Sequence, residues 1–345
     1  MNPLIASMLL AVTPLAATQE QTQPRALAVR VNRDVVEFLY GSQVLGRYQH
    51  GPSVAKPFLY PLALPGGPVL TRGWPMVKGL AGESTDHVHQ KSAWFCHGDI
   101  VPEGVALKQR VKGVEGVDFW SEVPGHGRIV CVEVGEPVVH GPSHVSVVTR
   151  NEWRTADGQP ILHETRTIHL FVIDGAVLWV IETDLHASVC AITFADTKEG
   201  AFGVRVNDQL SNKATRGVLS NSVGKRGEKE VWGKAADWCD YSGKVDGQEC
   251  GISLFDDPTN RPRAVWHSRE YGLMAANPFG RKKSGFPEMQ GRDDLVRLAK
   301  GDHLKLRYGI YLHPGDAQRG QVADAYKRFS AGNAKILTPQ DKQNP

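Results

Sequence analysis

Three histidines and two aspartates lie within the fourteen residues 86–99 of the chain. Such groups cost free energy to bury unless they are paired or ligated, so their concentration indicates an assembled polar site. Imidazole titrates near neutral pH, which makes it the usual proton carrier in enzymes. We therefore predict that His87, His89 and His97 are catalytic, and that Asp99 orients one of the imidazoles.

The spacing of these residues predicts how they converge. His87 and His89 are two residues apart, so an extended strand here would point both imidazoles to the same face. Gly98 would let the backbone turn, which would bring His97 and Asp99 toward the same place. This geometry suits an acid and a base that reach one substrate.

A metal ion is the alternative occupant of the same histidines. A zinc site needs three or four protein ligands with partners behind them. The spacing here matches no zinc signature, and HExxH is absent. We therefore favour no metal and no cofactor; if a divalent metal is bound, His87, His89 and His97 are the expected ligands.

Other candidate residues are spread along the chain. Glu164 is a further predicted catalytic carboxylate and shares a strand face with Arg166, although cross-strand ion pairs on a solvated face would look the same. Arg205 could clamp a carboxylate or two sugar hydroxyls. The predicted substrate-binding residues are Asp118, Trp120 as a stacking platform, Arg166, Arg205 and His267. Since GxSxG, P-loop and GxGxxG motifs are missing, we do not expect a serine hydrolase, an NTPase or a Rossmann oxidoreductase.

The elements that must position these residues are mainly β-strands. Residues 145–155, 161–173 and 176–186 are rich in β-branched and aromatic residues, and Asp157-Gly158 and Asp174-Gly175 separate them as hairpin turns. Shorter strands are predicted at 27–31, 35–40, 44–48, 129–134, 251–255, 273–276 and 304–312. We predict an all-β fold, a large antiparallel β-sandwich with one C-terminal helix over 317–331, whose apolar stripe packs on the core.

Composition and the chain ends bound the organisation. The net charge of +3 over 345 residues and the absence of a Lys/Arg run argue against a nucleic-acid partner. Residues 1–18 carry a short apolar run followed by small residues, which predicts a secretory signal and an exported, periplasmic or secreted protein. No later segment is apolar enough to span a membrane. Residues 24–336 are expected to form a single domain, and 337–345 a disordered tail.

Export would permit disulfides, and the chain has five cysteines. Cys239 and Cys250 flank a Gly-containing loop and are the expected bridge. At least one cysteine is left unpaired within the chain. The sequence leaves the oligomeric state open.

The histidine block resembles that of a bacterial family labelled PmoA, or methane oxygenase PmoA, with a pattern of roughly DHPHHxGxWFxHGDVNGVDFW. The residues that carry the resemblance are Asp86-His87-Val88-His89-Gln90-Lys91, Trp94-Phe95-Cys96-His97-Gly98-Asp99 and Gly116-Val117-Asp118-Phe119-Trp120. Glu164 with Arg166, residues 198–205 and Asn277-Pro278-Phe279-Gly280 look similar to further family blocks. The chain departs from the pattern at Val88 and Gln90 and by an insertion between Asp99 and Asp118.

The resemblance implies an exported protein of carbohydrate-degrading bacteria. It also implies a β-sandwich similar to galactose mutarotases, in which His and Glu act as acid and base at a sugar ring. Methane oxidation is not expected, because a methane monooxygenase subunit is an integral membrane protein with many apolar spans.

We therefore predict an exported carbohydrate-active enzyme that acts on a sugar or glycoside, an oxidised keto-sugar included, through histidine and carboxylate. Hydrolysis, elimination and epimerisation each move a proton, so all three stay open. The first alternative is a non-catalytic carbohydrate-binding protein, and the second is a metal-dependent enzyme of another class. A carbohydrate is the expected partner of both the carbohydrate-active enzyme and the non-catalytic binding protein.

Overall fold

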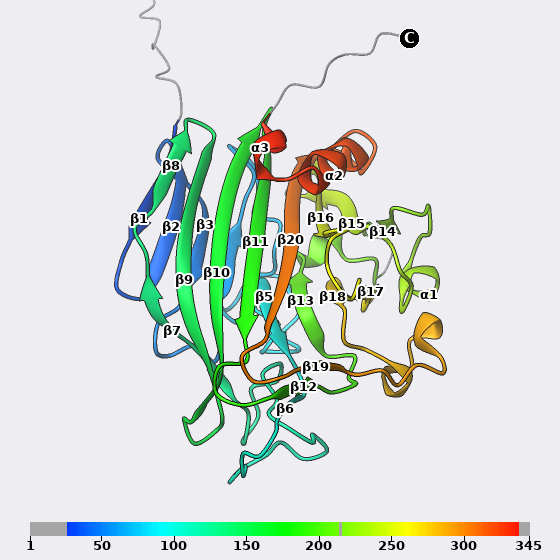
Figure 1. Ribbon diagram of the computed structural model, residues 1–345. Helices are drawn as coiled ribbons and strands as arrows, with labels where there is room; N and C mark the ends of the chain where they lie inside the picture. Colours follow the sequence, from blue (N-terminus) through cyan, green and yellow to red (C-terminus); the bar gives the residue numbers. More distant parts are fainter. Residues whose placement is uncertain (1–25, 214–215, 338–345) are drawn as a thin grey trace, which may run out of the picture.

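The computed structural model describes residues 26–213 and 216–337 (Figure 1). The predicted signal segment 1–18 lies outside the described residues, as does the predicted tail beyond Leu337. The extent of the single domain, 24–336, stays a prediction. None of the described helices has the length and apolar character of a membrane span.

Two large antiparallel sheets form the body of the molecule (Figure 1). The eight-stranded sheet has the order β1 (Leu27–Val31), β2 (Val35–Tyr40), β3 (Gln43–Gln49), β4 (Phe58–Leu62), β5 (Ala93–His97), β13 (Gly200–Arg205), β18 (Leu273–Asn277) and β17 (Val265–Trp266). The nine-stranded sheet has the order β14 (Val218–Asn221), β15 (Trp238–Val245), β16 (Gln248–Asp256), β20 (His303–Pro314), β11 (Ala176–His186), β10 (Pro160–Ile173), β9 (His144–Arg154) and β7 (Arg128–Val134), and β8 (Val138–Gly141) pairs with β9. A small third sheet contains β19 (Val296–Leu298), β12 (Ile192–Phe194) and β6 (Ile100–Pro102).

The long central strands follow from their turns. Asp174 and Gly175, which join β10 to β11, have φ angles of 47° and 83°. Two consecutive positive φ values define the tight hairpin turn that matches the twist of the flanking strands. The β10–β11 pairing then runs from Ile173 opposite Ala176 to His163 opposite His186. The predicted meander of three long strands and the all-β antiparallel class are confirmed.

The core lies between the two large sheets. Phe95 of β5 contacts Trp153 of β9 and Tyr308 of β20, with ring centroids 5.9 and 6.2 Å apart. Phe202 of β13 lies 5.1 Å from the same Tyr308 ring. Because side chains alternate along a strand, Trp94 and Arg205 point to the outer face of the eight-stranded sheet.

Short helices cover the outer face of the nine-stranded sheet. The predicted helix over 317–331 is present but shorter: α2 spans Val322–Ser330, and α3 (Asn333–Ile336) follows it (Figure 1). The apolar stripe of α2 is buried, as predicted. Besides the predicted C-terminal helix, the described residues include two helices of four residues each, α3 and α1 (Glu228–Val231).

The expected Cys239–Cys250 bridge is wrong. All five cysteines are free. Although β15 and β16 pair, Cys239 lies opposite Leu254 and Cys250 lies opposite Gly243, so the two thiols are held several residues apart along the ladder.

Candidate functional site

Two buried arginines meet one carboxylate on the outer face of the eight-stranded sheet. Arg72 and Arg205 donate to the same Asp86 oxygen, Oδ1, at 2.5 and 3.0 Å. Both also donate to the Ser84 hydroxyl, at 3.3 and 3.1 Å. The Arg72 side chain is 0% exposed and that of Arg205 is 1% exposed. Burial alone would raise the pKa of Asp86, but the two guanidinium groups outweigh it and lower that pKa.

An aromatic stack extends from this ion cluster toward solvent. The guanidinium carbon of Arg205 lies 4.5 Å from the ring centroid of Tyr271. The imidazole of His87 stacks on the Tyr271 ring at 5.0 Å, and the ring of His89 meets His87 edge-on at 5.8 Å. We call Arg72, Asp86, His87, His89, Arg205 and Tyr271 the arginine–histidine cluster.

His87 and His89 lie in a loop and not in the extended strand that their spacing predicts. His87 has a φ of 43°, and the amide of Gln90 donates to the His87 carbonyl at 2.9 Å, which closes a turn. A positive φ is costly for a residue with a Cβ. Arg72 offsets this cost by donating to the carbonyls of His87 and Gln90 at 3.0 and 3.3 Å. The two imidazoles still meet, but through a turn.

Burial, assisted by the charge of Lys56, lowers the pKa of the His89 imidazole to about 4. Lys56 is itself buried and donates to the Trp120 carbonyl at 2.8 Å and to Glu122 at 3.3 Å. Lys91 donates to the other Glu122 oxygen at 2.5 Å. A neutral imidazole at pH 7 can accept a proton from a substrate.

A second titratable group, Glu199, lies immediately before β13. Its side chain is half-buried, and no described residue donates a hydrogen bond to its carboxyl group. Burial raises its pKa, and the Asp118 carboxylate adds to this rise. Tyr271 of the arginine–histidine cluster is within electrostatic range of the same group. Glu199 is therefore a carboxyl group suited to hold and donate a proton.

His267, a predicted substrate-binding residue, follows β17 on the same sheet. It is buried, and its Nδ1 accepts a hydrogen bond from the Trp232 indole at 2.9 Å. Burial lowers its pKa to about 3, with smaller contributions from Arg269 and Lys198. The same two cations act on Glu199, which places both groups in one electrostatic environment.

His97 lies apart from the other two histidines of the sequence cluster. It points into the core, where its ring packs against Phe279 and Phe194 at 4.9 and 5.9 Å. Its Nε2 contacts the Ala195 carbonyl at 2.8 Å. The structure therefore places His97 apart from His87 and His89, so the three imidazoles do not form one group, and the roles of His97 as proton carrier or metal ligand stay predictions.

Asp99 does not orient a histidine. Its two oxygens accept the amides of Gly116 and Glu115 at 2.7 and 3.1 Å, so it fixes the loop that precedes Asp118. The prediction that a turn at Gly98 brings His97 and Asp99 together is wrong. The Gly98 amide instead donates to the carbonyl of Glu199, the residue that precedes β13.

Glu164 and Arg166 are an interior ion pair and are not exposed to a substrate. Arg166 donates through Nε and Nη2 to the two Glu164 oxygens at 2.7 and 3.0 Å, and both side chains are nearly fully buried. The Trp153 indole donates to Glu164 at 3.0 Å, and Arg166 also reaches Tyr48 at 3.4 Å. These partners lie between the sheets, so the structure places the pair in the core, and its roles in catalysis and hydroxyl binding stay predictions.

The side chains of the predicted binding residues Asp118 and Trp120 are also engaged in contacts within the protein. Asp118 accepts the amides of Trp120 and Ser121 at 2.7 and 3.0 Å and so caps a turn. Trp120 is 2% exposed and meets Trp94 edge-on at 5.1 Å. It therefore packs over the sheet and offers no open face for stacking.

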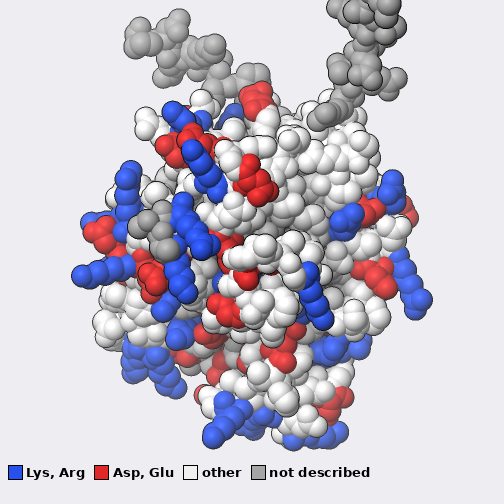
Figure 2. Space-filling view, turned by 180° about the vertical axis from the view of Figure 1, so that it is seen from behind, with Lys and Arg blue, Asp and Glu red and all other residues white. Residues whose placement is uncertain are grey.

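Of the residues predicted from sequence, the structure brings together His87, His89 and Arg205. Sequence reasoning missed Arg72, Tyr271 and the role of Glu199. The block 198–205 did signal a carboxylate near a guanidinium. Arg72 and Tyr271 carried no sequence signal, because only the fold brings them to residues 86–89. Figure 2 shows the molecule from behind the view of Figure 1, on the side of the eight-stranded sheet, with acidic and basic side chains interspersed over the surface.

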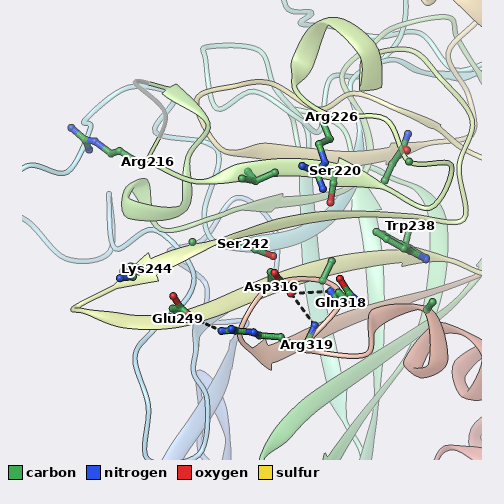
Figure 3. Close-up of a pocket in the computed structure, with 16 residues that line it drawn as sticks. Arg216, Ser220, Arg226, Trp238, Ser242, Lys244, Glu249, Asp316, Gln318 and Arg319 are labelled. Atoms are coloured by element: carbon green, nitrogen blue, oxygen red, sulfur yellow. Dashed lines mark hydrogen bonds and ion pairs between the residues drawn. The ribbon is translucent and has the colours of Figure 1, made fainter.

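A pocket of about 830 Å³ lies elsewhere, on the outer face of the nine-stranded sheet (Figure 3). Trp238 and Arg226 line it, and Arg319 in the facing loop is paired with Glu249 at 2.7 Å. The described residues that line this pocket include no histidine. Acid–base chemistry is therefore better supplied by the arginine–histidine cluster and Glu199.

The fold and this site define an antiparallel β-sandwich protein with a polar, titratable cluster on one sheet. The chain belongs to a family of unknown function, DUF6807, whose sequence pattern matches residues 35–327. No curated protein sequence matches the chain.

Several solved structures are similar to the chain at low identity. A galactose mutarotase-like protein from Lactobacillus casei has a TM-score of 0.35 and 10% identity, over 83% of this chain and 100% of that one. A putative aldose 1-epimerase from Escherichia coli K12 has a TM-score of 0.33 and 11% identity, over 84% and 99%. A GH36 α-galactosidase from Geobacillus stearothermophilus has a TM-score of 0.38 and 9% identity, over 85% and 41%.

Proposed function

We propose that the chain is an exported carbohydrate-active enzyme that moves a proton at a sugar or glycoside bound beside the arginine–histidine cluster. The observation that carries this proposal is the Glu199 carboxyl group, which is half-buried, has a raised pKa and accepts no hydrogen bond from a described residue. A carboxyl group in such surroundings is a candidate general acid. The resemblance to the PmoA-labelled bacterial family agrees with the sugar substrate and with export, but not with methane oxidation.

The second partner in the reaction is the neutral imidazole of His89. Enzymes that use an acid and a base push the pKa values of the two groups in opposite directions. Here burial raises the pKa of Glu199 and lowers that of His89 to about 4. We assign Glu199 the role of acid and His89 that of base. This pair can serve hydrolysis, elimination or epimerisation.

The arginine–histidine cluster supplies the binding groups. Arg72 and Arg205 hold the loop that carries His87 and His89, and His87 leaves 39% of its side chain exposed to a ligand. The Tyr271 ring contacts both the Arg205 guanidinium, at 4.5 Å, and the His87 imidazole, at 5.0 Å. A purely stacking sugar site needs an open aromatic face. Because Tyr271 already contacts two side chains of the described cluster, catalysis is favoured over a non-catalytic carbohydrate-binding role.

Mass spectrometry of products tests the proposal. The purified chain is incubated with glycosides, polysaccharides and 3-keto-glycosides, and each product mass shows whether water is added, removed or neither. Glu199→Gln and His89→Ala are expected to lower turnover at least about 100-fold, the usual contribution of a positioned acid or base.

Glu249→Gln is the matched control, because that carboxylate is exposed in the pocket of Figure 3 and lies on the other sheet. Its turnover should equal that of the wild type. Loss of activity in Glu249→Gln with full activity in Glu199→Gln would move the site to that pocket. Binding of a sugar without any product would support the non-catalytic alternative. Sequencing the N-terminus of the protein released by its own cells tests export, which predicts cleavage near residue 18.

A further inference from the structure

Three histidines converge at one end of the nine-stranded sheet, outside the site described above. The ligand atoms of His140, His144 and His169 all lie within 4.8 Å of one another. His140 belongs to β8, His144 begins β9 and His169 lies in β10, so three neighbouring strands contribute one imidazole each. Figure 1 shows β8 and the start of β9 at the same end of the sheet as α3.

The sheet itself holds two of the rings in place. His169 lies opposite Ser146, and His144 lies opposite Phe171, in the β9–β10 pairing. The His144 ring stacks on Phe171 at 3.9 Å and on His140 at 4.1 Å. Only a small rotation is therefore open to His144, which leaves its Nε2 facing His169.

We propose that His140, His144 and His169 bind a divalent late-transition metal ion, with Zn²⁺ as the ion to test. The His144 Nε2 and His169 Nδ1 atoms are 3.1 Å apart. In a tetrahedral zinc site with Zn–N distances near 2.0–2.1 Å, ligand nitrogens are separated by about 3.3 Å. The two rings need little movement to accept the ion.

His140 completes the set from the solvent side. It is exposed, and its Nε2 contacts the Ser146 hydroxyl at 2.8 Å. An exposed side chain can turn toward the ion at small cost, and the exposed side also admits the metal and a water as fourth ligand. Three imidazoles without a thiolate suit Zn²⁺, Cu²⁺ or Ni²⁺ and do not suit Mg²⁺ or Ca²⁺.

A carboxylate stands behind the buried ligand. His169 Nε2, on the side of the ring away from His144, lies 3.3 Å from the Asn333 amide nitrogen and 3.9 Å from Glu182 Oε2. Asn333 donates to Glu182 at 2.9 Å, and Arg307 does so at 3.3 Å. Metal-bound histidines commonly donate their second N–H to such a carboxylate, which fixes the tautomer. Because Asn333 belongs to α3, a bound ion would also tie this helix to the sheet.

Zinc binding by the untagged, chelator-treated full chain tests the proposal. Equilibrium dialysis with ZnCl₂, followed by elemental analysis, should recover one ion per chain, and Mg²⁺ should not be retained. His144→Ala is expected to weaken binding more than about 100-fold. Glu182→Gln keeps all three ligands and should weaken binding about 10-fold to 100-fold, the range for loss of a partner behind a ligand.

His303→Ala is the matched control, because His303 stacks on His186 at 4.1 Å, pairs with Asp184 at 2.7 Å and lies outside the three-histidine group on the same sheet. It should bind zinc like the wild type. Circular dichroism without metal confirms that each variant folds, and exposed His140→Ala replaces His144→Ala if that variant does not. Absence of zinc from the wild type, or equal retention by the wild type and both ligand variants, would overturn the proposal.

Discussion

At the residue scale, one carboxylate oxygen, Asp86 Oδ1, accepts hydrogen bonds from two buried guanidinium groups. Arg205 also donates to the Gln90 side chain at 2.7 Å, so one planar fork holds Asp86, Ser84 and Gln90 together. Lysine has one compact ammonium group and cannot reproduce these directions. The loop that carries His87 and His89 therefore depends on the guanidinium geometry and not on charge alone.

Arg205→Lys should destabilise the fold by about 1–3 kcal/mol, because lysine keeps the charge but leaves buried acceptors without a donor. Urea unfolding monitored by tryptophan fluorescence measures this change. Arg150→Lys is the control, because Arg150 is 67% exposed and its pairing with Glu133 spans 3.4 Å. That variant should change stability by less than about 0.5 kcal/mol. Equal stability of Arg205→Lys and the wild type would show that charge alone suffices.

Individual residues also show which parts of the candidate site could be predicted from the sequence and which could not. His97 and Glu164 were singled out for their chemistry, and the core uses both as buried, bonded residues. Sequence cannot show which face of a strand a residue takes when both faces are buried, as they are along β5. His89 and Arg205 were found because their neighbours in sequence are also neighbours in the site. Arg72 lies outside the motif and reaches it only through the fold.

At the scale of elements, hairpin signals determined what could be predicted. Where β-branched runs flank a two-residue turn, as in β10 and β11, strand and pairing follow from the sequence alone. Strands such as β5 and β13 lack this signal, since their partners are distant in the chain. The pairing of β5 with β13 nevertheless positions Arg205, so the elements that build the site were the least predictable.

The helix α2 packs on the nine-stranded sheet through its buried face. Its buried residue Phe329 lies 5.5 Å from the Phe255 ring, and the Arg307 guanidinium carbon lies 4.0 Å from the Phe329 ring centroid. Phe329→Ala should lower the free energy of unfolding by about 3–5 kcal/mol, because it leaves a cavity between helix and sheet. Lys327→Ala on the exposed side should change it by less than about 1 kcal/mol. Thermal unfolding of the two variants compares them directly, and similar midpoints would mean that α2 does not stabilise the sheet.

At the scale of the whole molecule, the sandwich keeps several imidazoles neutral by burial. The pKa of His97 is lowered to about 4 and that of His267 to about 3, in both cases chiefly by burial. In the unfolded chain each would titrate near 6.5. The unfolded chain therefore binds more protons than the folded one below this pH, and the stabilisation present above pH 6.5 is lost as the pH falls toward 4.

This linkage makes acid sensitivity a property of the core and not of the surface charge. His97→Gln keeps a donor for the Ala195 carbonyl and removes the titration. Between pH 7 and pH 4.5, the wild type should lose about 2 kcal/mol more stability than this variant, because His97 alone contributes that difference. The comparison uses urea unfolding of each protein at both pH values, so a constant cost of the substitution cancels. Parallel losses in the two proteins would mean that His97 takes up its proton without unfolding, and that the interior around Phe194 and Phe279 admits water.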